Sequence, residues 1–151
     1  MADALPNSFD LPDGWLLAAL PVTTIATLNH DSGTLSGPQA TVSYTDDAGM
    51  TADVTLYALD NTEIAQVLLE ELALSSSDGS ARPLDLPAIG DGSFAYETGI
   101  SRPQPRFVVV RTGATIALVS GRGEEGQPFD IGHLEQLARL VSDRVRTART
   151  P

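Results

Sequence analysis

Three short runs of alternating apolar residues stand close together in the second half of the chain. They are "SFAYET", "RFVVVR" and "ATIALVS", and all three lie within residues 93–120. The second and third runs are joined by Thr112 and Gly113 alone, and so short a connection joins antiparallel neighbours, because parallel strands need a long crossover. The pattern predicts a three-stranded antiparallel meander, which commits the chain to a fold with a substantial sheet.

Further strands and two helices are predicted around this meander. The runs "QATVSYT" and "MTADVTLYAL" flank an Asp-Asp-Ala-Gly turn and predict an N-terminal hairpin. Val22 to Leu28 is rich in β-branched residues and predicts a strand, which Pro21 is expected to separate from the apolar residues before it. Helical spacing of apolar residues predicts one helix after Asp60 and a last helix after Asp130.

Each helix has a predicted apolar face. In the helix that Asp60 and Asn61 open, with Glu63 at capping-box spacing from Asp60, the face consists of Ile64, Val67, Leu68 and Leu72. In the last helix the face consists of Leu134, Leu137, Ala138, Val141 and Val145.

The order of these elements, β-β-β-α-β-β-β-α, predicts an α+β fold. Its antiparallel sheet consists of the N-terminal hairpin and the three-stranded C-terminal meander, and two helices pack on one face. A length of 151 residues suits a single domain. We place that domain at residues 15–146, after an irregular lead-in at 1–14 and before a tail at 147–151.

Composition excludes several classes of function. A net charge of −11 repels the phosphates of nucleic acids and anionic membranes, so neither is an expected partner. The chain has no cysteine, which rules out disulfides, thiolate metal sites and cysteine nucleophiles.

No apolar run is long enough for a transmembrane helix, and no signal-peptide pattern follows Met1. The protein is therefore expected to be cytoplasmic, or extracytoplasmic with Met-Ala standing in place of an export signal.

Two glycine-rich stretches resemble ligand loops only superficially. Gly121 to Gly126, "GRGEEG", matches G-x-G-x-x-G, but Gln127 and Pro128 separate it from the helix and its two glutamates would face the phosphates. Gly90-Asp91-Gly92 lacks the spacing of a calcium loop. We interpret this second stretch as a tight turn before a strand, in which Gly92 is expected to adopt a positive φ.

No catalytic or metal-binding constellation is predicted. His30 and His133 are the only histidines, and no third ligand has matching spacing. His30, Asp31 and Ser32 have the residue types of a catalytic triad, but immediate neighbours in sequence cannot converge as a triad requires. We predict no cofactor, no metal and no enzymatic activity.

The meander predicts two apolar faces. If Thr98 pairs with Arg106, then Tyr96 lies opposite Val108 and Phe94 lies opposite Val110. Period-two alternation places Phe107, Val109, Ile116 and Leu118 on one face. It places Phe94, Tyr96, Val108, Val110, Ala117 and Val119 on the other face.

The second apolar face needs a cover if both helices occupy the first. The cover is the N-terminal segment with Trp15, a partner chain, or an apolar ligand in a groove. The residues predicted to bind a ligand or form an interface are therefore Trp15, Phe94, Tyr96, Val108 and Val110.

The turn "GDGSFAY" at Gly90–Tyr96 is followed by the hairpin "FVVVRTGATIALVSG" and the helix "LEQLARLVSDRV". In this pattern residues 86–146 resemble a module of actinobacterial cell-envelope proteins, namely small lipoproteins and the extracellular sensor domains of receptor-like Ser/Thr kinases. The resemblance implies an α+β domain outside the cytoplasm that binds a ligand or a partner. The chain departs from the family in lacking a lipobox and the disulfides of the kinase sensor domains.

These observations leave three hypotheses for function. The first is a non-enzymatic binding or sensing domain of a cell-envelope protein with a small or lipidic ligand. The second is a protein–protein interaction module, either a homodimer or a subunit of a complex, that uses an apolar sheet face. The third is a hydrolase whose carboxylates the sequence does not single out.

Overall fold

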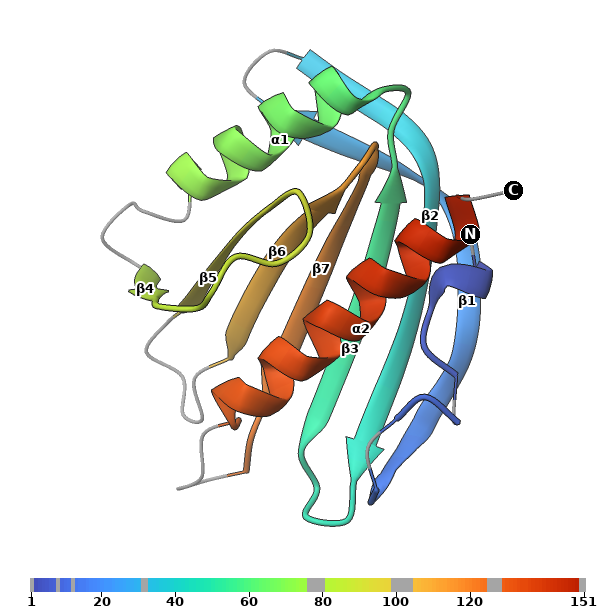
Figure 1. The fold of residues 1–151 in the computed structure, drawn as a ribbon, viewed down its shortest axis with the longest axis vertical. Helices are drawn as coiled ribbons and strands as arrows, with labels where there is room; N and C mark the ends of the chain where they lie inside the picture. The colour runs from blue at the N-terminus through green and yellow to red at the C-terminus, as the bar shows by residue number, and fades with distance from the viewer. Residues whose placement is uncertain are drawn as a thin grey trace.

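The fold is known from a computed structural model that describes residues 2–7, 9–11, 13–30, 33–75, 81–98, 105–124 and 129–149. Of these residues 49% lie in strands and 28% in helices. Seven strands form one open antiparallel sheet in the order β1-β2-β3-β7-β6-β5-β4 (Figure 1). The strands are β1 (Trp15–His30), β2 (Gly33–Asp46), β3 (Thr51–Ala58), β4 (Ala81–Leu84), β5 (Gly92–Thr98), β6 (Arg106–Thr112) and β7 (Thr115–Arg122).

Two helices, α1 (Thr62–Ser75) and α2 (Ile131–Arg149), cover opposite faces of this sheet. Successive side chains of a strand point to opposite faces. On β6, Val108 and Val110 pack in a core with residues of α2, whereas Val109 packs in a second core with residues of α1. Figure 1 shows α2 crossing the central strands on the near side of the sheet.

The predicted fold class is therefore wrong. Strands dominate over helices, the antiparallel sheet has seven strands, and the two helices do not share a face. The pairing of β3 with β7 joins the two halves, and it brings together segments far apart in sequence that no local pattern links. Since both faces of β5, β6 and β7 are apolar, each face takes its own helix.

The predicted strand register within the meander is also wrong. Phe94 pairs with Val109 and Tyr96 with Phe107, a shift of one residue from the expected partners. A shift of one residue moves side chains to the other face, so Phe94 and Tyr96 lie on the α1 side. The following turn consists of Gly113 and Ala114, with Gly113 at φ 61°.

Pro21 does not divide the first apolar segment. β1 runs without a break for 16 residues, but its register against β2 shifts twice, between Leu17 and Ala19 and between Ala19 and Val22. These irregularities are β-bulges, and proline is tolerated in a sheet at an edge or a bulge. Since β1 is an edge strand, Pro21 does not remove a bond from the interior of the sheet.

The helix ends follow the local sequence. Asn61, rather than Asp60, caps α1, because its side-chain oxygen accepts from the Ile64 amide at 2.9 Å. Asp130 caps α2 by accepting from the Gly132 amide at 2.7 Å. The apolar face predicted for α2 is confirmed, since all five residues are buried. On α1, Leu68 is buried as predicted, together with Ala65 and Leu69, whereas Val67 and Leu72 are exposed.

Several residues of the lead-in belong to the α2-side core. It contains a short 3-10 helix, Ala2–Ala4, and Leu5 is buried. The guanidinium of Arg144 on α2 donates to the carboxylate of Asp10 at 2.7 Å and to the carbonyl oxygen of Asp3 at 2.8 Å. The predicted boundary at residue 14 thus marks the point where irregular backbone ends and β1 begins. It does not mark the edge of the hydrophobic core, because Ala4 and Leu5 belong to that core.

Replacing Tyr44 with phenylalanine is expected to loosen this lead-in. Tyr44 is fully buried, and its hydroxyl donates to the carbonyl oxygen of Pro6 at 2.7 Å. Tyr44→Phe leaves that carbonyl without its donor, so the free energy of unfolding should fall by about 1–2 kcal/mol. Urea denaturation followed by circular dichroism measures the change. Tyr57→Phe, at a half-buried site on β3, is the control and should change stability by less than about 0.5 kcal/mol; equal midpoints for both variants would contradict this account.

None of the helices in the part of the chain that the structure describes is long and apolar enough to cross a lipid bilayer.

Candidate binding surface

The structure does not bring the five predicted binding residues together. Val108 and Val110 are 1% and 0% exposed beneath α2. Trp15 lies at the margin of the same core, with its ring 5.7 Å from that of Phe129. Phe94 and Tyr96 lie on the opposite face, beside α1. The face predicted to need a cover is covered by α2 and the lead-in.

A small hollow remains near Trp15. It is lined by Leu11, Trp15, Tyr44, Phe129, His133 and Leu137. Its volume is about 20 Å³, which is room for one or two water molecules, whereas sites for drug-sized ligands measure about 300–1,000 Å³. Burial raises the pKa of Tyr44 far above its usual value, so this phenol stays neutral. The hollow does not have room for a lipid chain.

Three aromatic rings are stacked on the α1 face of β5 and β6. The centroids of Phe94 and Tyr96 are 5.8 Å apart, and those of Tyr96 and Phe107 are 4.9 Å apart. All three residues are half-buried, and burial raises the pKa of Tyr96. The rings pack against one another next to α1 and extend the core on that side of the sheet.

The most buried carboxylate, Glu97, is held by two arginines. Arg106 approaches one oxygen at 3.2 Å, and Arg82 contacts the other oxygen. Arg106 also donates to the carbonyl oxygen of Phe129 at 2.8 Å, just before α2 begins. This cluster connects β4, β5 and β6 to the start of α2. Because each oxygen of the Glu97 carboxylate contacts an arginine, we assign the cluster a structural role.

The Gly90-Asp91-Gly92 stretch is a turn. Asp91 accepts from the Gly113 amide at 2.7 Å, and Arg111 donates to the Asp91 carbonyl oxygen at 3.2 Å. These bonds fasten the start of β5 to the β6–β7 turn. Gly90 has φ 63°, whereas Gly92 does not have a positive φ, so the expectation for Gly92 is wrong. Within the described ranges no group of three or more His, Cys, Asp or Glu residues is placed to hold a metal ion.

A two-stranded arm projects beyond the rest of the sheet. β2 pairs with β3 only from Gln39 onward, so the segment Gly33–Pro38 has β1 as its one strand neighbour. We call Ile25–His30 and Gly33–Pro38 the arm; in Figure 1 it lies at the far end of β1 and β2, beside α1. Leu35 packs the arm against the core beneath α1, whereas the β1 strand of the arm lies at the border of the sheet.

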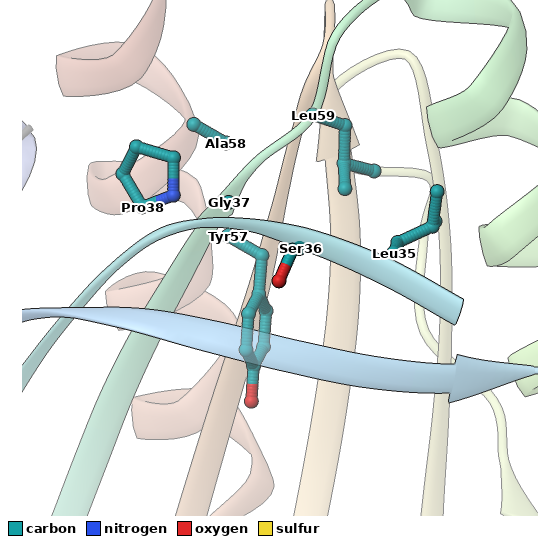
Figure 2. Close-up of a pocket in the computed structure, with 7 residues that line it drawn as sticks. All are labelled: Leu35, Ser36, Gly37, Pro38, Tyr57, Ala58 and Leu59. Atoms are coloured by element: carbon teal, nitrogen blue, oxygen red, sulfur yellow. The ribbon is translucent and has the colours of Figure 1, made fainter.

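A second hollow marks the root of the arm. Figure 2 shows its lining residues, which are Leu35, Ser36, Gly37, Pro38, Tyr57, Ala58 and Leu59. Its volume is about 10 Å³, so it holds at most one water molecule. A β-carbon on Gly37 would lie 2.7 Å from the carbonyl oxygen of Ala58. Glycine at position 37 is therefore required for β2 to pass this close to the end of β3. The root of the arm is therefore tightly packed against the end of β3.

β1 carries the exposed apolar residues of the sheet. Leu16, Leu20, Val22 and Ile25 are between 57% and 78% exposed. From Trp15 to Thr45 the sequence contains one ionised residue, Asp31, although charged residues make up 19% of the whole chain. An apolar and uncharged edge on a protein with a net charge of −11 is the feature that most resembles a contact surface.

The two edges of the sheet differ in their protection. β4 has four residues, and Arg82 and Pro83 stand at its centre. A short strand, a charge and a proline are the means by which natural sheets prevent further strand pairing. β1 has two bulges and Pro21 in its first half, but its second half, Val22–His30, has no bulge, no proline and no ionised residue. We call Val22–His30 the open edge.

The sequence did not reveal this surface, because β1 contains no catalytic or metal-binding motif and lies outside the meander whose second apolar face was the predicted site. The signal that could have revealed it is the near absence of charge from Trp15 to Thr45, combined with β-branched residues at positions 22–25. The pattern predicts strands, but it does not show which strand lies at the edge of the sheet.

A scan against protein-family models, a search of curated proteins and a search of solved structures each found no match for this chain. Its function is therefore inferred from its own residues.

Proposed function

We propose that this chain is a non-enzymatic binding domain that docks a partner protein through β1 and the arm. The observation that carries the proposal is the uncharged second half of β1 at the border of a seven-stranded sheet, where the side chains of Val22 and Ile25 are exposed. The free N–H and C=O groups of an edge strand bind an added strand, while alternate side chains supply specificity. The resemblance of residues 86–146 to modules of cell-envelope proteins favours a setting outside the cytoplasm for this contact.

A protein fits this surface better than a small or lipidic ligand. The hollow at Trp15 and the hollow at the root of the arm have volumes of about 20 and 10 Å³. A lipid chain needs an enclosed apolar groove, whereas Leu20, Val22 and Ile25 stand on an open strand. The protein–protein interaction hypothesis is thus the one that the geometry favours over the ligand-binding hypothesis.

Site-specific photo-cross-linking tests the proposal. A benzophenone amino acid at position 25, on the open edge, should form adducts with protein in cells of the native host. The same amino acid at Val67, which is 46% exposed on α1, is the matched control and should form few adducts. Adding the substitution Val22→Lys should suppress the adducts at position 25, because a lysine on an edge strand opposes strand pairing. Equal adduct yields at positions 25 and 67, or yields that Val22→Lys does not change, would contradict the proposed function.

A further inference from the structure

We infer that the partner at the open edge is a second copy of this chain, and that Val22–His30 of the two copies pair as antiparallel strands. This inference rests on the proposed function, and it names the partner of the same surface. The two seven-stranded sheets then continue into one another across β1.

Charge distribution selects the open edge for contact between copies. Each copy carries a net charge of −11, so two copies repel one another over most of their surfaces. Val22–His30 contains no acid, lysine or arginine. A pair of identical acidic molecules meets with least repulsion where neither brings a charge, and this strand is such a place.

The residue types of the open edge favour strand pairing. Val22, Thr23, Thr24 and Ile25 are consecutive β-branched residues with exposed side chains, and β-branched residues favour the pleated strand. The opposite edge at β4 carries Arg82 and Pro83, which oppose such pairing. The open edge therefore lacks the features that prevent strand addition at β4 and can accept another strand.

Twofold symmetry restricts the register of such a pair. A twofold axis that relates two antiparallel strands of one sheet stands perpendicular to the sheet, so one residue lies opposite its own copy. Pairing over the whole of Val22–His30 places position 26 on the axis. Ile25 then lies opposite Thr27 of the second copy and diagonal to that copy's Ile25, on the same face, about 7–8 Å away.

The first measurement is sedimentation velocity of the whole chain from about 1 μM to about 300 μM, a range that spans weak and moderate dimers. We expect a monomer at the low end and a dimer at the high end. Ile25→Glu places two like charges on diagonal positions and should weaken the dimer at least about tenfold. Val67→Glu adds the same charge on α1 and should leave the dimer unchanged. A wild-type chain that stays monomeric, or a dimer that both variants affect equally, would overturn the inference.

The second measurement reports the register. The chain has no cysteine, so single cysteines can be placed without background. Cysteines at positions 23 to 27, one at a time, are oxidised with diamide. Ala26→Cys should form the intermolecular disulfide fastest, because residues directly opposite each other across a ladder have β-carbons within bonding range. Thr23→Cys, on the same strand but opposite position 29 of the copy, is the control and should cross-link slowly. Equal rates at all five positions would overturn the inference.

The two proposals fail separately. If the chain is monomeric but position 25 still cross-links to another protein, the partner is not a second copy and the proposed function stands. If position 25 cross-links to nothing while the chain dimerises elsewhere, both the proposed function and the pairing at the open edge are wrong.

Discussion

Gly90→Ala is expected to lower the free energy of unfolding by about 2 kcal/mol or more. Gly90 has φ 63°, a conformation that residues with a β-carbon avoid. A β-carbon there would also lie 2.6 Å from the carbonyl oxygen of Arg111, which is backbone and has little room to move. That same oxygen accepts from the Asp91 amide at 2.8 Å, so the added methyl group strains the bond that fixes the turn to β6. Urea denaturation monitored by circular dichroism gives the change in midpoint.

Gly92→Ala is the matched control for that experiment. Gly92 lacks a positive φ, and its added β-carbon would meet the end of the flexible Leu69 side chain at 2.9 Å. A side chain can shift where a carbonyl cannot, so this variant should lose less than about 1 kcal/mol. If Gly92→Ala proved the more damaging of the two, the assignment of the left-handed residue in this turn would be wrong.

Local sequence patterns predicted the elements better than their arrangement. The apolar spacing of α2 was sufficient to identify its buried face, because all five residues contact one sheet surface. β4 was missed because "ARPL" contains an arginine and a proline, which suit a short edge strand and give no alternating signal. β1 was predicted in two pieces because proline breaks interior strands, but not edge strands at a bulge.

The face assignments required information that the sequence does not contain. Residues 99–105 separate β5 from β6 in the sequence, and a shift of one residue in the pairing of these strands moved Phe94 and Tyr96 to the α1 side. The pairing of β3 with β7 is equally inaccessible, because it depends on contacts between distant segments. Without that pairing, the open edge of β1 could not be recognised as the border of the sheet.

Val108→Asp is expected to unfold the domain. Val108 is 1% exposed on β6, flanked by Ala95 on β5 and Val119 on β7, and it packs in the core with residues of α2. An aspartate there would be an unpaired charge in an apolar core, at a cost of about 4 kcal/mol or more. Domains of this kind have total stabilities of about 5–15 kcal/mol, so the variant should lose most of its ordered circular dichroism signal or melt far below the wild type.

Val67→Asp is the control for Val108→Asp, since it introduces the same side chain at an exposed valine on α1 and should change stability by less than about 0.5 kcal/mol. Sizing chromatography on both variants separates the remaining possibilities. If Val108→Asp stays folded and unchanged in size, α2 does not cover β6 as the structure has it. If it stays folded but converts a dimer into a monomer, the interface lies on this face of the sheet and not at the open edge. Unfolding of Val108→Asp, together with a folded Ile25→Glu monomer, would assign Val108 to the core and Ile25 to the contact between copies.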